Sequence, residues 1–163
     1  MGAPRSPEPV LIAFGSNLGN RRKNLEWALQ QLSKCEGVSC LHASSFQETE
    51  PVGYAEQPRF LNGAVFLNFH GSVQELLALL QAIEKVAGKA TPFPNGPRTL
   101  DLDIIFFGSL VHSAPDLTVP HPRWAERNFV VEPLQEIAHA LSSETFPPAW
   151  QAKINAAAEK LQA

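Results

Sequence analysis

The sequence contains only two cysteines, Cys35 and Cys40, among its 163 residues. Two cysteines are too few for a disulfide-stapled scaffold, and neither lies in a CxxC pair or beside a histidine at the spacing of a metal site. Both are therefore expected to be free thiols. Free thiols are typical of a reducing compartment, so the predicted location is cytoplasmic.

Charged residues and long apolar runs are also scarce. Charged residues make up 18% of the chain, and sixteen acidic against thirteen basic side chains give a formal net charge of -3. This balance provides no bulk attraction for nucleic acid or for an anionic membrane. No stretch approaches the roughly 20 consecutive apolar residues that span a bilayer. The expected partners are therefore small molecules, with neither nucleic acid nor a membrane among them.

The sequence does contain enough apolar surface for one core. Hydrophobic residues make up 44% of the chain and the mean hydropathy is -0.10, which excludes a mostly disordered protein. A length of 163 residues is typical of one domain. Residues 1–9 hold three prolines and no apolar run. We therefore expect a flexible tail over 1–9 and a single domain over 10–163. The chain is also expected to be a monomer.

Apolar patterns predict alternating strands and helices up to residue 108. The predicted strands cover 10–14, part of 38–50, 61–69 and 100–107, and the predicted helices run from a Ser16–Asn17 cap towards Gly37 and from Ser72 to Gly88. This β-α-β-β-α-β order is typical of the ferredoxin-like α+β fold, an antiparallel sheet with both helices on one face. A proline-rich loop, a helix around 130–138 and a terminal helix from about Ala149 are predicted to form a C-terminal helical extension.

The segment GPRTLDLDI, residues 96–104, carries the most informative chemistry. In a strand, Asp101 and Asp103 would share one face, roughly 7 Å apart, while Leu102 would point to the other. Two carboxylates this close favour a bound cation, and Mg²⁺ takes one or two carboxylates and completes its shell with water and substrate phosphates. The alternative is the hydrated face of an edge strand.

Three further segments carry weaker signals. Glu84 lies at the edge of the apolar face of the second predicted helix, where a carboxylate either finds a partner or is a tolerated boundary residue. Residues 15–19, GSNLG, lack the spacing of a P-loop and are predicted to form a tight turn. Residues 118–129 combine histidine, arginines and aromatics, which suit phosphate oxygens and a flat heterocycle, although surface basic residues are often only solvated.

Five motifs, in this order and spacing, closely resemble the 6-hydroxymethyl-7,8-dihydropterin pyrophosphokinase family of folate biosynthesis. They are FGSNL from Phe14, QPRFLN from Gln57, GPRTLDLD from Gly96, VPHP from Val119 and RNF from Arg127. The likeness runs from about Val10 to Leu141. It implies a 2-amino-4-hydroxy-6-hydroxymethyldihydropteridine diphosphokinase, which transfers diphosphate from ATP to the pterin hydroxymethyl oxygen and releases AMP.

The resemblance also implies the site residues. Asp101 and Asp103 would hold two Mg²⁺ ions on the phosphates of ATP, the co-substrate. Phe60 and Phe129 would sandwich the pterin, whose edge would be read by Asn62 and by backbone groups around Thr49 and Val52. Arg98, His121 and Arg127 would contact phosphates, and Gln81, Glu84 and Thr118 would line the nucleotide site.

The sequence departs from the family pattern just after the glycine that ends the second predicted helix. Many relatives have arginines there, whereas this chain has Lys89, which keeps the charge but not the bidentate fork of a guanidinium. Lys89, Arg98, Asp101 and Asp103 form the predicted catalytic set. From the residues alone, two other functions stay open: a Mg²⁺-dependent phosphodiester hydrolase that uses the same aspartates, and a non-catalytic ferredoxin-like ligand-binding module.

Overall fold

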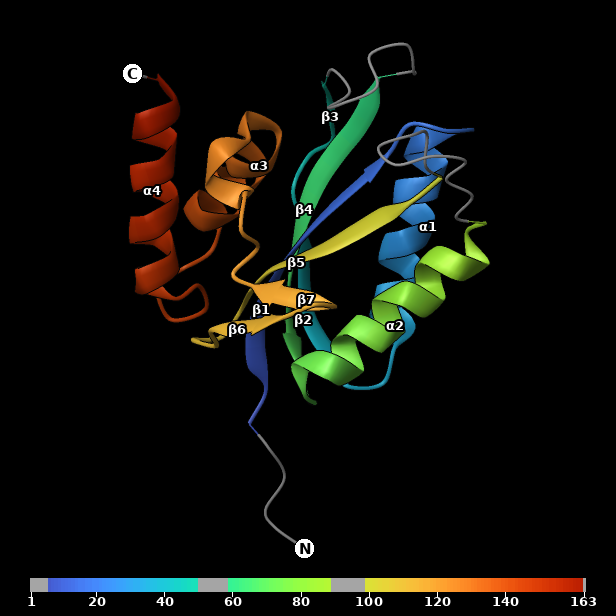
Figure 1. Ribbon diagram of the computed structural model, residues 1–163, viewed down its shortest axis with the longest axis horizontal. Helices are drawn as coiled ribbons and strands as arrows, with labels where there is room; N and C mark the ends of the chain where they lie inside the picture. Colours follow the sequence, from blue (N-terminus) through green and yellow to red (C-terminus); the bar gives the residue numbers. More distant parts are fainter. Residues whose placement is uncertain (1–5, 50–58, 89–98, 163) are drawn as a thin grey trace, which may run out of the picture.

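The computed structural model describes residues 6–49, 59–88 and 99–162. It is an α+β protein in which one antiparallel sheet separates two pairs of helices (Figure 1). The main-sheet strands are β1 (Glu8–Ser16), β2 (Val38–Ala43), β3 (Gln47–Thr49), β4 (Phe60–Phe69) and β5 (Asp101–Phe107). The helices are α1 (Arg21–Lys34), α2 (Val73–Val86), α3 (Asn128–Ala140) and α4 (Pro148–Gln162).

The long strands of the sheet are ordered β2-β4-β1-β5, and β3 pairs with the same strand, β4, as β2 does. Every recorded pairing is antiparallel. The central strand β1 contains the continuous apolar run that predicts a buried strand, and Val10, Leu11 and Ile12 are fully buried. This strand begins at Glu8, so the last two residues of the predicted tail 1–9 belong to the sheet instead.

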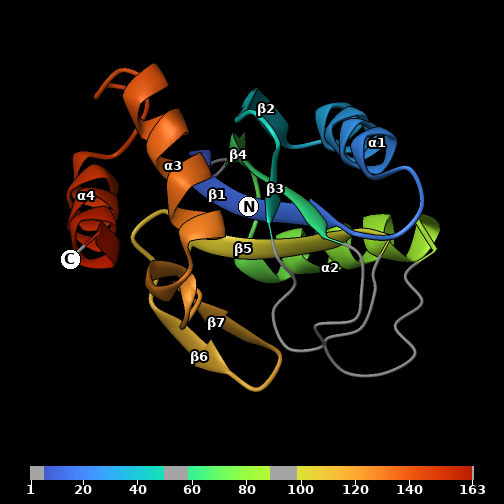
Figure 2. The ribbon, with the colours of Figure 1, turned by 90° about the horizontal axis from the view of Figure 1, so that it is seen from above.

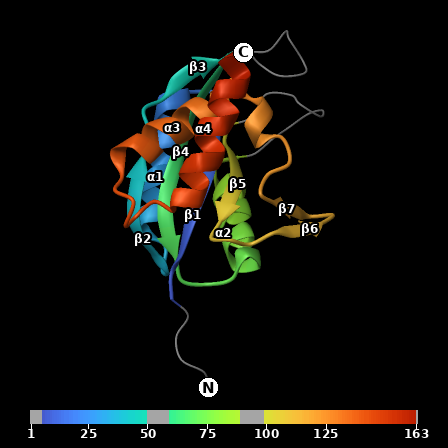
Figure 3. The same ribbon diagram turned by 90° about the vertical axis from the view of Figure 1, so that its left-hand side faces the viewer.

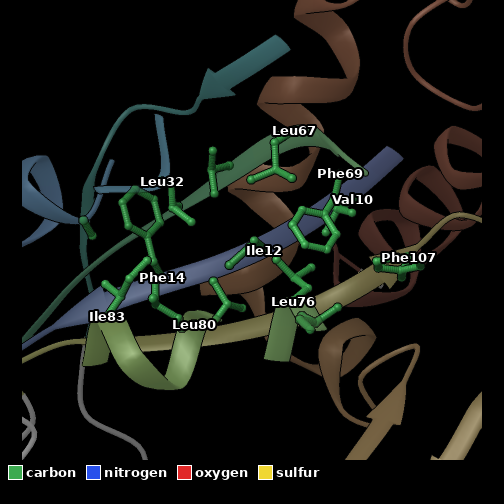
Figure 4. Close-up of a cluster of buried hydrophobic side chains, with 14 of the residues drawn as sticks. Val10, Ile12, Phe14, Leu32, Leu67, Phe69, Leu76, Leu80, Ile83 and Phe107 are labelled. Atoms are coloured by element: carbon green, nitrogen blue, oxygen red, sulfur yellow. The ribbon is translucent and has the colours of Figure 1, made fainter. Parts of the chain in front are cut away.

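The first core lies between the sheet and the pair α1 and α2 (Figure 4). Ile12 and Phe14 of β1 face Leu76 and Leu80 of α2, with Leu32 of α1 at the same layer. Helix α2 begins at a capping box, because Ser72 Oγ accepts from the Glu75 amide while the Glu75 carboxylate accepts from the Ser72 amide. The prediction of this helix from its apolar period and its serine cap is confirmed.

The second core lies on the opposite face of the sheet, beneath α3 and α4 (Figures 2 and 3). Leu11, Phe66 and Phe106 of the sheet pack against Trp150 and Ile154 of α4. The two predicted C-terminal helices are confirmed, and they form a third layer of the fold. None of the helices within the described ranges has the length and apolar character needed to cross a membrane.

Two local predictions are wrong, and a third is refined by the structure. Asn20 caps α1 with its side chain, whereas Ser16 and Asn17 are buried at the end of β1 and in the turn that follows. The strand predicted for part of 38–50 is found as two strands, β2 and β3, which residues 44–46 separate. The proline-rich loop contains a hairpin, β6 (His112–Ala114) and β7 (Leu117–Val119), followed by a 3₁₀ turn over Trp124–Glu126. Strands of three residues are too short for an alternating pattern to be recognised.

Cys35 and Cys40 are both free thiols, as the cysteine count predicts. The strand-to-helix turn is shorter than the predicted 15–19, because Gly15 and Ser16 belong to β1. Asn24 of α1 donates to Ser16 Oγ at 3.1 Å and to the Leu18 carbonyl oxygen at 2.8 Å. Gly19 has a φ of 74°, a left-handed conformation that glycine adopts without strain. The turn therefore fixes where α1 begins relative to β1.

Candidate functional site

The two predicted metal-binding carboxylates lie on one face of β5. Asp101 is opposite Gly15 of β1 and Asp103 is opposite Ala13, while Leu102 between them is buried in the core beneath α1 and α2. Asp101 and Asp103 therefore face the side of the sheet that carries α3 and α4. Both aspartates are half-buried, so their carboxylates lie within the surface of the protein and not on an isolated, fully solvated edge.

Gly15 connects these carboxylates to the predicted pterin residues. It is opposite Asp101 on one side and opposite Asn62 of β4 on the other, so the three residues form one row across β5, β1 and β4. A Cβ atom on Gly15 would lie 2.5 Å from Asn62 Oδ1. With strands spaced about 4.8 Å apart, the row is about 10 Å long and has no side chain at its centre.

Asn62, Thr49 and Phe60 lie together at the β3 end of the sheet. Asn62 is 8% exposed, and its Nδ2 donates to Thr49 Oγ1. Thr49 is opposite Phe60, which is two residues before Asn62 on the same face of β4. The structure thus brings together three of the residues that the resemblance assigns to the pterin. Of the other two, Phe129 lies at the beginning of α3 and Val52 lies outside the described residues.

Glu84 is buried and helps to fix the strand that carries the aspartates. The residue is 5% exposed, and its Oε2 accepts from the backbone amide of Leu102 at 2.8 Å. This amide lies between Asp101 and Asp103, on the edge of β5 that β1 does not occupy. The carboxylate at the edge of the apolar helix face thus has a partner, and α2 is tied to the aspartate-bearing strand.

His121 lies against the same edge of β5, since its backbone amide donates to the Ile105 carbonyl oxygen at 3.1 Å. Burial lowers the pKa of His121, and the neighbouring positive charges of Arg127 and Arg123 lower it further, while Asp101 opposes them. The Arg123 amide donates to His121 Nδ1 at 3.2 Å, which assigns the proton of the neutral ring to Nε2. His121 is therefore prepared to donate a hydrogen bond from Nε2 without carrying a charge.

Arg127 and Phe129 lie at the beginning of α3. The guanidinium carbon of Arg127 is 5.8 Å from the centre of the Phe129 ring, within the range of a cation–π contact. Phe129 is half-buried and packs against the second core. The second core thus fixes the position of the Phe129 ring. The positive charge of Arg127 and the negative charge of Asp101 both act on His121.

The remaining predicted residues lie elsewhere or are not described. Gln81 is exposed on α2, one turn before Glu84, and Thr118 is half-buried in β7, opposite Ser113. Lys89 and Arg98 lie outside the described residues. The assignments of Gln81 and Thr118 to the nucleotide and of Lys89 and Arg98 to catalysis stay predictions.

The carboxylates of β5 fit a metal that is completed by its substrate. In the described part of the chain, no group of three or more histidine, cysteine, aspartate or glutamate side chains is arranged to hold an ion. A protein-only cage is therefore absent from these residues. Two half-buried carboxylates on one strand face suit Mg²⁺, whose remaining positions are usually filled by water and phosphate oxygens.

Sequence reasoning missed three contributors to the site. Gly15 was predicted only as a turn residue, whereas it forms the centre of the row within β1. Arg21 and Glu136 hold the two ends of the β3 segment, through Glu48 and through Ser45. No local pattern identifies these contacts, because the partners are 27 and 91 residues apart in the chain.

Comparison with known proteins gives matches over most of the chain. Residues 11–139 match the family model described as 7,8-dihydro-6-hydroxymethylpterin-pyrophosphokinase. The chain is 43% identical over 133 residues to the 2-amino-4-hydroxy-6-hydroxymethyldihydropteridine pyrophosphokinase of Bacillus subtilis, an alignment that covers 82% of this chain and 80% of that protein.

Longer fungal and plant proteins are also similar. The folic acid synthesis protein fol1 of Schizosaccharomyces pombe is 37% identical over 150 residues, which cover 92% of this chain and 20% of that protein. The mitochondrial folate synthesis bifunctional protein of Pisum sativum is 42% identical over 139 residues, which cover 85% of this chain and 27% of that protein. The chain thus spans only about a fifth to a quarter of the length of these relatives.

Proposed function

The chain belongs to the 7,8-dihydro-6-hydroxymethylpterin-pyrophosphokinase family, and from this premise we propose that it transfers diphosphate from ATP to 6-hydroxymethyl-7,8-dihydropterin in folate synthesis. The observation that carries the proposal is the row Asp101–Gly15–Asn62 on one face of the sheet. It places carboxylates suited to metal and phosphate beside an amide suited to a heterocycle, with an open backbone position between them.

The pterin occupies the Asn62 end of this row. A flat ring with a polar edge needs two apolar faces and a few directional hydrogen bonds. Phe60 on the sheet and Phe129 on α3 supply the faces, and the carboxamide of Asn62 supplies donors and an acceptor to the edge. Thr49 orients that carboxamide by accepting from its Nδ2, and backbone groups around Thr49 and Val52 complete the edge.

ATP occupies the aspartate end. Asp101 and Asp103 would hold two Mg²⁺ ions, which would offset the negative charge of the phosphates. Arg98, His121 and Arg127 contact phosphate oxygens, and Gln81, Glu84 and Thr118 line the nucleotide. Lys89 brings one further positive charge. The neutral His121 Nε2–H suits a phosphate oxygen as a hydrogen-bond donor, and it does so without the desolvation cost of a buried charge.

The reaction depends mainly on the alignment of the two substrates and on neutralisation of the phosphate charge. The pterin hydroxymethyl oxygen forms a bond to the β-phosphorus, the bond between that phosphorus and the oxygen bridging to the α-phosphorus breaks, and AMP leaves while the hydroxyl proton passes to solvent. Phosphoryl transfer needs little covalent help from a protein, because alignment and neutralisation of the developing charge supply most of the rate. Two substrates bound at β4 and β5, the strands on either side of β1 in one rigid sheet, would have that alignment.

The strand order β2-β4-β1-β5, with α1 and α2 on one face, supports a ferredoxin-like arrangement extended by α3 and α4. We propose that the protein acts as a monomer in the cytoplasm. The pea relative is named as mitochondrial, so cell fractionation with an antibody to this chain is the direct check of the compartment.

One assay tests the proposed reaction. The protein is incubated with ATP and Mg²⁺, with and without 6-hydroxymethyl-7,8-dihydropterin, and AMP is quantified. We expect AMP only when the pterin is present, in equal amount to pterin diphosphate. Release of AMP without the pterin would point to a phosphodiester hydrolase, and binding of both ligands without AMP would point to a non-catalytic module.

The aspartates supply the matched variants for this assay. We expect Asp101→Asn and Asp103→Asn each to lower turnover by about 10²-fold, the usual effect of losing one preorganised electrostatic contact. Asp116→Asn removes the same charge from an exposed position next to β7 and should leave turnover unchanged. Circular dichroism establishes that all three variants are folded. Normal activity in both strand variants would remove Asp101 and Asp103 from the metal site.

A further inference from the structure

Three separate parts of the chain meet at the side chain of Arg21, the first residue of α1. Arg21 Nη2 forms an ion pair with Glu48 Oε1 of β3, and Arg21 Nη1 donates to the Arg59 carbonyl oxygen at 2.9 Å. Asn20, whose side chain caps the helix by accepting from the Lys23 amide at 3.1 Å, fixes where α1 begins. The position of the guanidinium is therefore set by the cap and by two partners.

Both partners of Arg21 are direct neighbours of predicted pterin residues. Glu48 precedes Thr49, which accepts from Asn62, and Arg59 precedes Phe60. These residues belong to a short pairing in which Thr49 is opposite Phe60 and Glu48 is opposite Leu61. A strand of three residues has few ladder hydrogen bonds to hold it, so its end depends on contacts from outside the sheet.

We propose that Arg21 is a positioning residue for the pterin: it fixes the end of the β3–β4 pairing so that the Thr49 hydroxyl, the Asn62 amide and the Phe60 ring face the ligand together. This inference rests on the proposed function. Arg21 does not belong to the row of Asp101, Gly15 and Asn62, and acts through Glu48 and the Arg59 carbonyl.

The bidentate geometry explains why arginine is suited to this position. One planar guanidinium donates through two separate nitrogens, Nη1 to a backbone carbonyl and Nη2 to a carboxylate, so the two strands are held at a fixed separation. A lysine ammonium is a compact point charge that cannot reproduce the fork. The side chain of Glu48 is 49% exposed, and exposed ion pairs contribute little to global stability. The expected effect of losing Arg21 is therefore on ligand position and not on folding.

Calorimetry on the full chain separates these effects. Affinity is measured for a non-hydrolysable ATP analogue with Mg²⁺, and then for 6-hydroxymethyl-7,8-dihydropterin in the presence of that analogue. We expect Arg21→Ala to weaken pterin binding about tenfold, the scale of one lost set of directional contacts, with Arg21→Lys between it and the parent protein. The affinity for the ATP analogue should stay within about twofold.

Lys23→Ala provides the matched control, because it removes one positive charge from the same helical turn at an exposed position. It should change neither affinity. Amide hydrogen exchange gives a second readout: exchange over Gln47–Thr49 should accelerate in Arg21→Ala and not in Lys23→Ala. This measurement needs no substrate. It therefore tests whether Arg21 holds β3 even if the chain does not transfer diphosphate.

The outcomes distinguish the two proposals. Unchanged pterin affinity in Arg21→Ala, or equal weakening of both ligands, would overturn the positioning role while leaving the proposed reaction intact. A parent protein that binds no pterin would overturn the proposed function and the pterin part of this inference with it. Unchanged exchange over β3 would show that Arg21 does not hold the strand.

Discussion

Gly15 is the residue at which the two halves of the candidate site meet. Its missing side chain leaves the centre of the row open, and a Cβ atom there would lie 2.5 Å from Asn62 Oδ1. The atom that it would meet belongs to the amide proposed to read the pterin edge. Because β1 is paired on both sides, the backbone has little freedom to move away.

We therefore expect Gly15→Ala to displace the Asn62 amide and weaken pterin binding by about 1–3 kcal/mol, the usual range when buried hydrogen-bond partners are separated. Calorimetry with the pterin measures the loss. In an Asn62→Ala background the same change should cost much less, since the atom that it displaces is absent. Fully additive losses in the double variant would show that Gly15 acts through something other than Asn62.

His121 makes folding stability depend on pH. Its pKa is lowered, chiefly by burial, so the folded protein binds fewer protons than the unfolded chain between the folded pKa and the ordinary value near 6.5. The contribution of His121 to stability is thus complete above about pH 6.5 and is lost as the pH falls towards the folded pKa. We expect the melting temperature to fall more steeply over this window in the parent than in His121→Gln.

Thermal unfolding followed by circular dichroism at a series of pH values gives the comparison. His139→Gln, which changes an exposed histidine on α3, is the control and should retain the slope of the parent. A parallel loss of stability in the parent and His121→Gln below pH 6.5 would show that the ring is not buried as a neutral group.

At the scale of elements, Glu136 ties α3 to the connection between β2 and β3. Its two carboxylate oxygens accept from the Ser45 amide and the Ser45 hydroxyl, each at 2.6 Å. Next to it, Ser44 Oγ accepts from the Ala64 amide at 2.8 Å. The interruption between the two short strands is thus a fixed corner, and the helix that begins near Phe129 is anchored to the strand that ends at Thr49.

Glu136→Ala should lower the free energy of unfolding by about 1 kcal/mol, because two charge-assisted hydrogen bonds are lost at an exposed position where water replaces part of them. Urea denaturation measures the change. Glu132→Ala, one turn earlier on the exposed side of the same helix, should have little effect. Equal stability of the two variants would mean that the Ser45 contact contributes nothing to the fold.

The elements that could be predicted from the sequence are those with a long local pattern. The apolar run from Val10 and the helical period after Ser72 specify β1 and α2 without help from the rest of the chain. The three-residue strands β3, β6 and β7 exist because of their partners and have no pattern of their own. The aspartate pair could be predicted because both residues belong to one strand.

The remainder of the candidate site depends on pairing between distant residues. Gly15 faces Asn62 and Asp101 only once three strands are in register, and Glu48 meets Arg21 only once α1 is packed. The local sequence specifies neither the strand register nor the contact between Glu48 and Arg21. The resemblance supplied Asn62, Phe60 and Phe129 as candidates. It included Gly15 in a motif without assigning it a role, and Arg21 and Glu136 lie outside all five motifs.

For the whole molecule, the sheet has a core on each face, and α4 belongs to the second one. Ile154 and Trp150 are buried, and the Trp150 indole nitrogen donates to the Gly108 carbonyl oxygen at 3.0 Å, at the end of β5. The same face carries the ligand row further along the sheet. Helix α4 thus supports the sheet that presents the row.

We expect Ile154→Ala to lower the free energy of unfolding by about 2–5 kcal/mol, the cost of a cavity in a packed core. Urea denaturation provides the value, and Lys160→Ala, an exposed change on the same helix, should leave it unchanged. A decrease in the free energy of unfolding as small as that of the control would show that α4 contributes little to the stability of the fold.

The row across β5, β1 and β4 also makes the proposed diphosphate transfer a reporter of how the chain has folded. Side chains alternate between the faces of a strand, so a slip of β1 by one residue would replace Gly15 in the row by Phe14 or Ser16 and close the gap. Such a misfolded molecule would retain much of its secondary structure. In refolded samples, the ratio of activity to circular dichroism signal would then report the fraction of molecules in which β1 has the correct register.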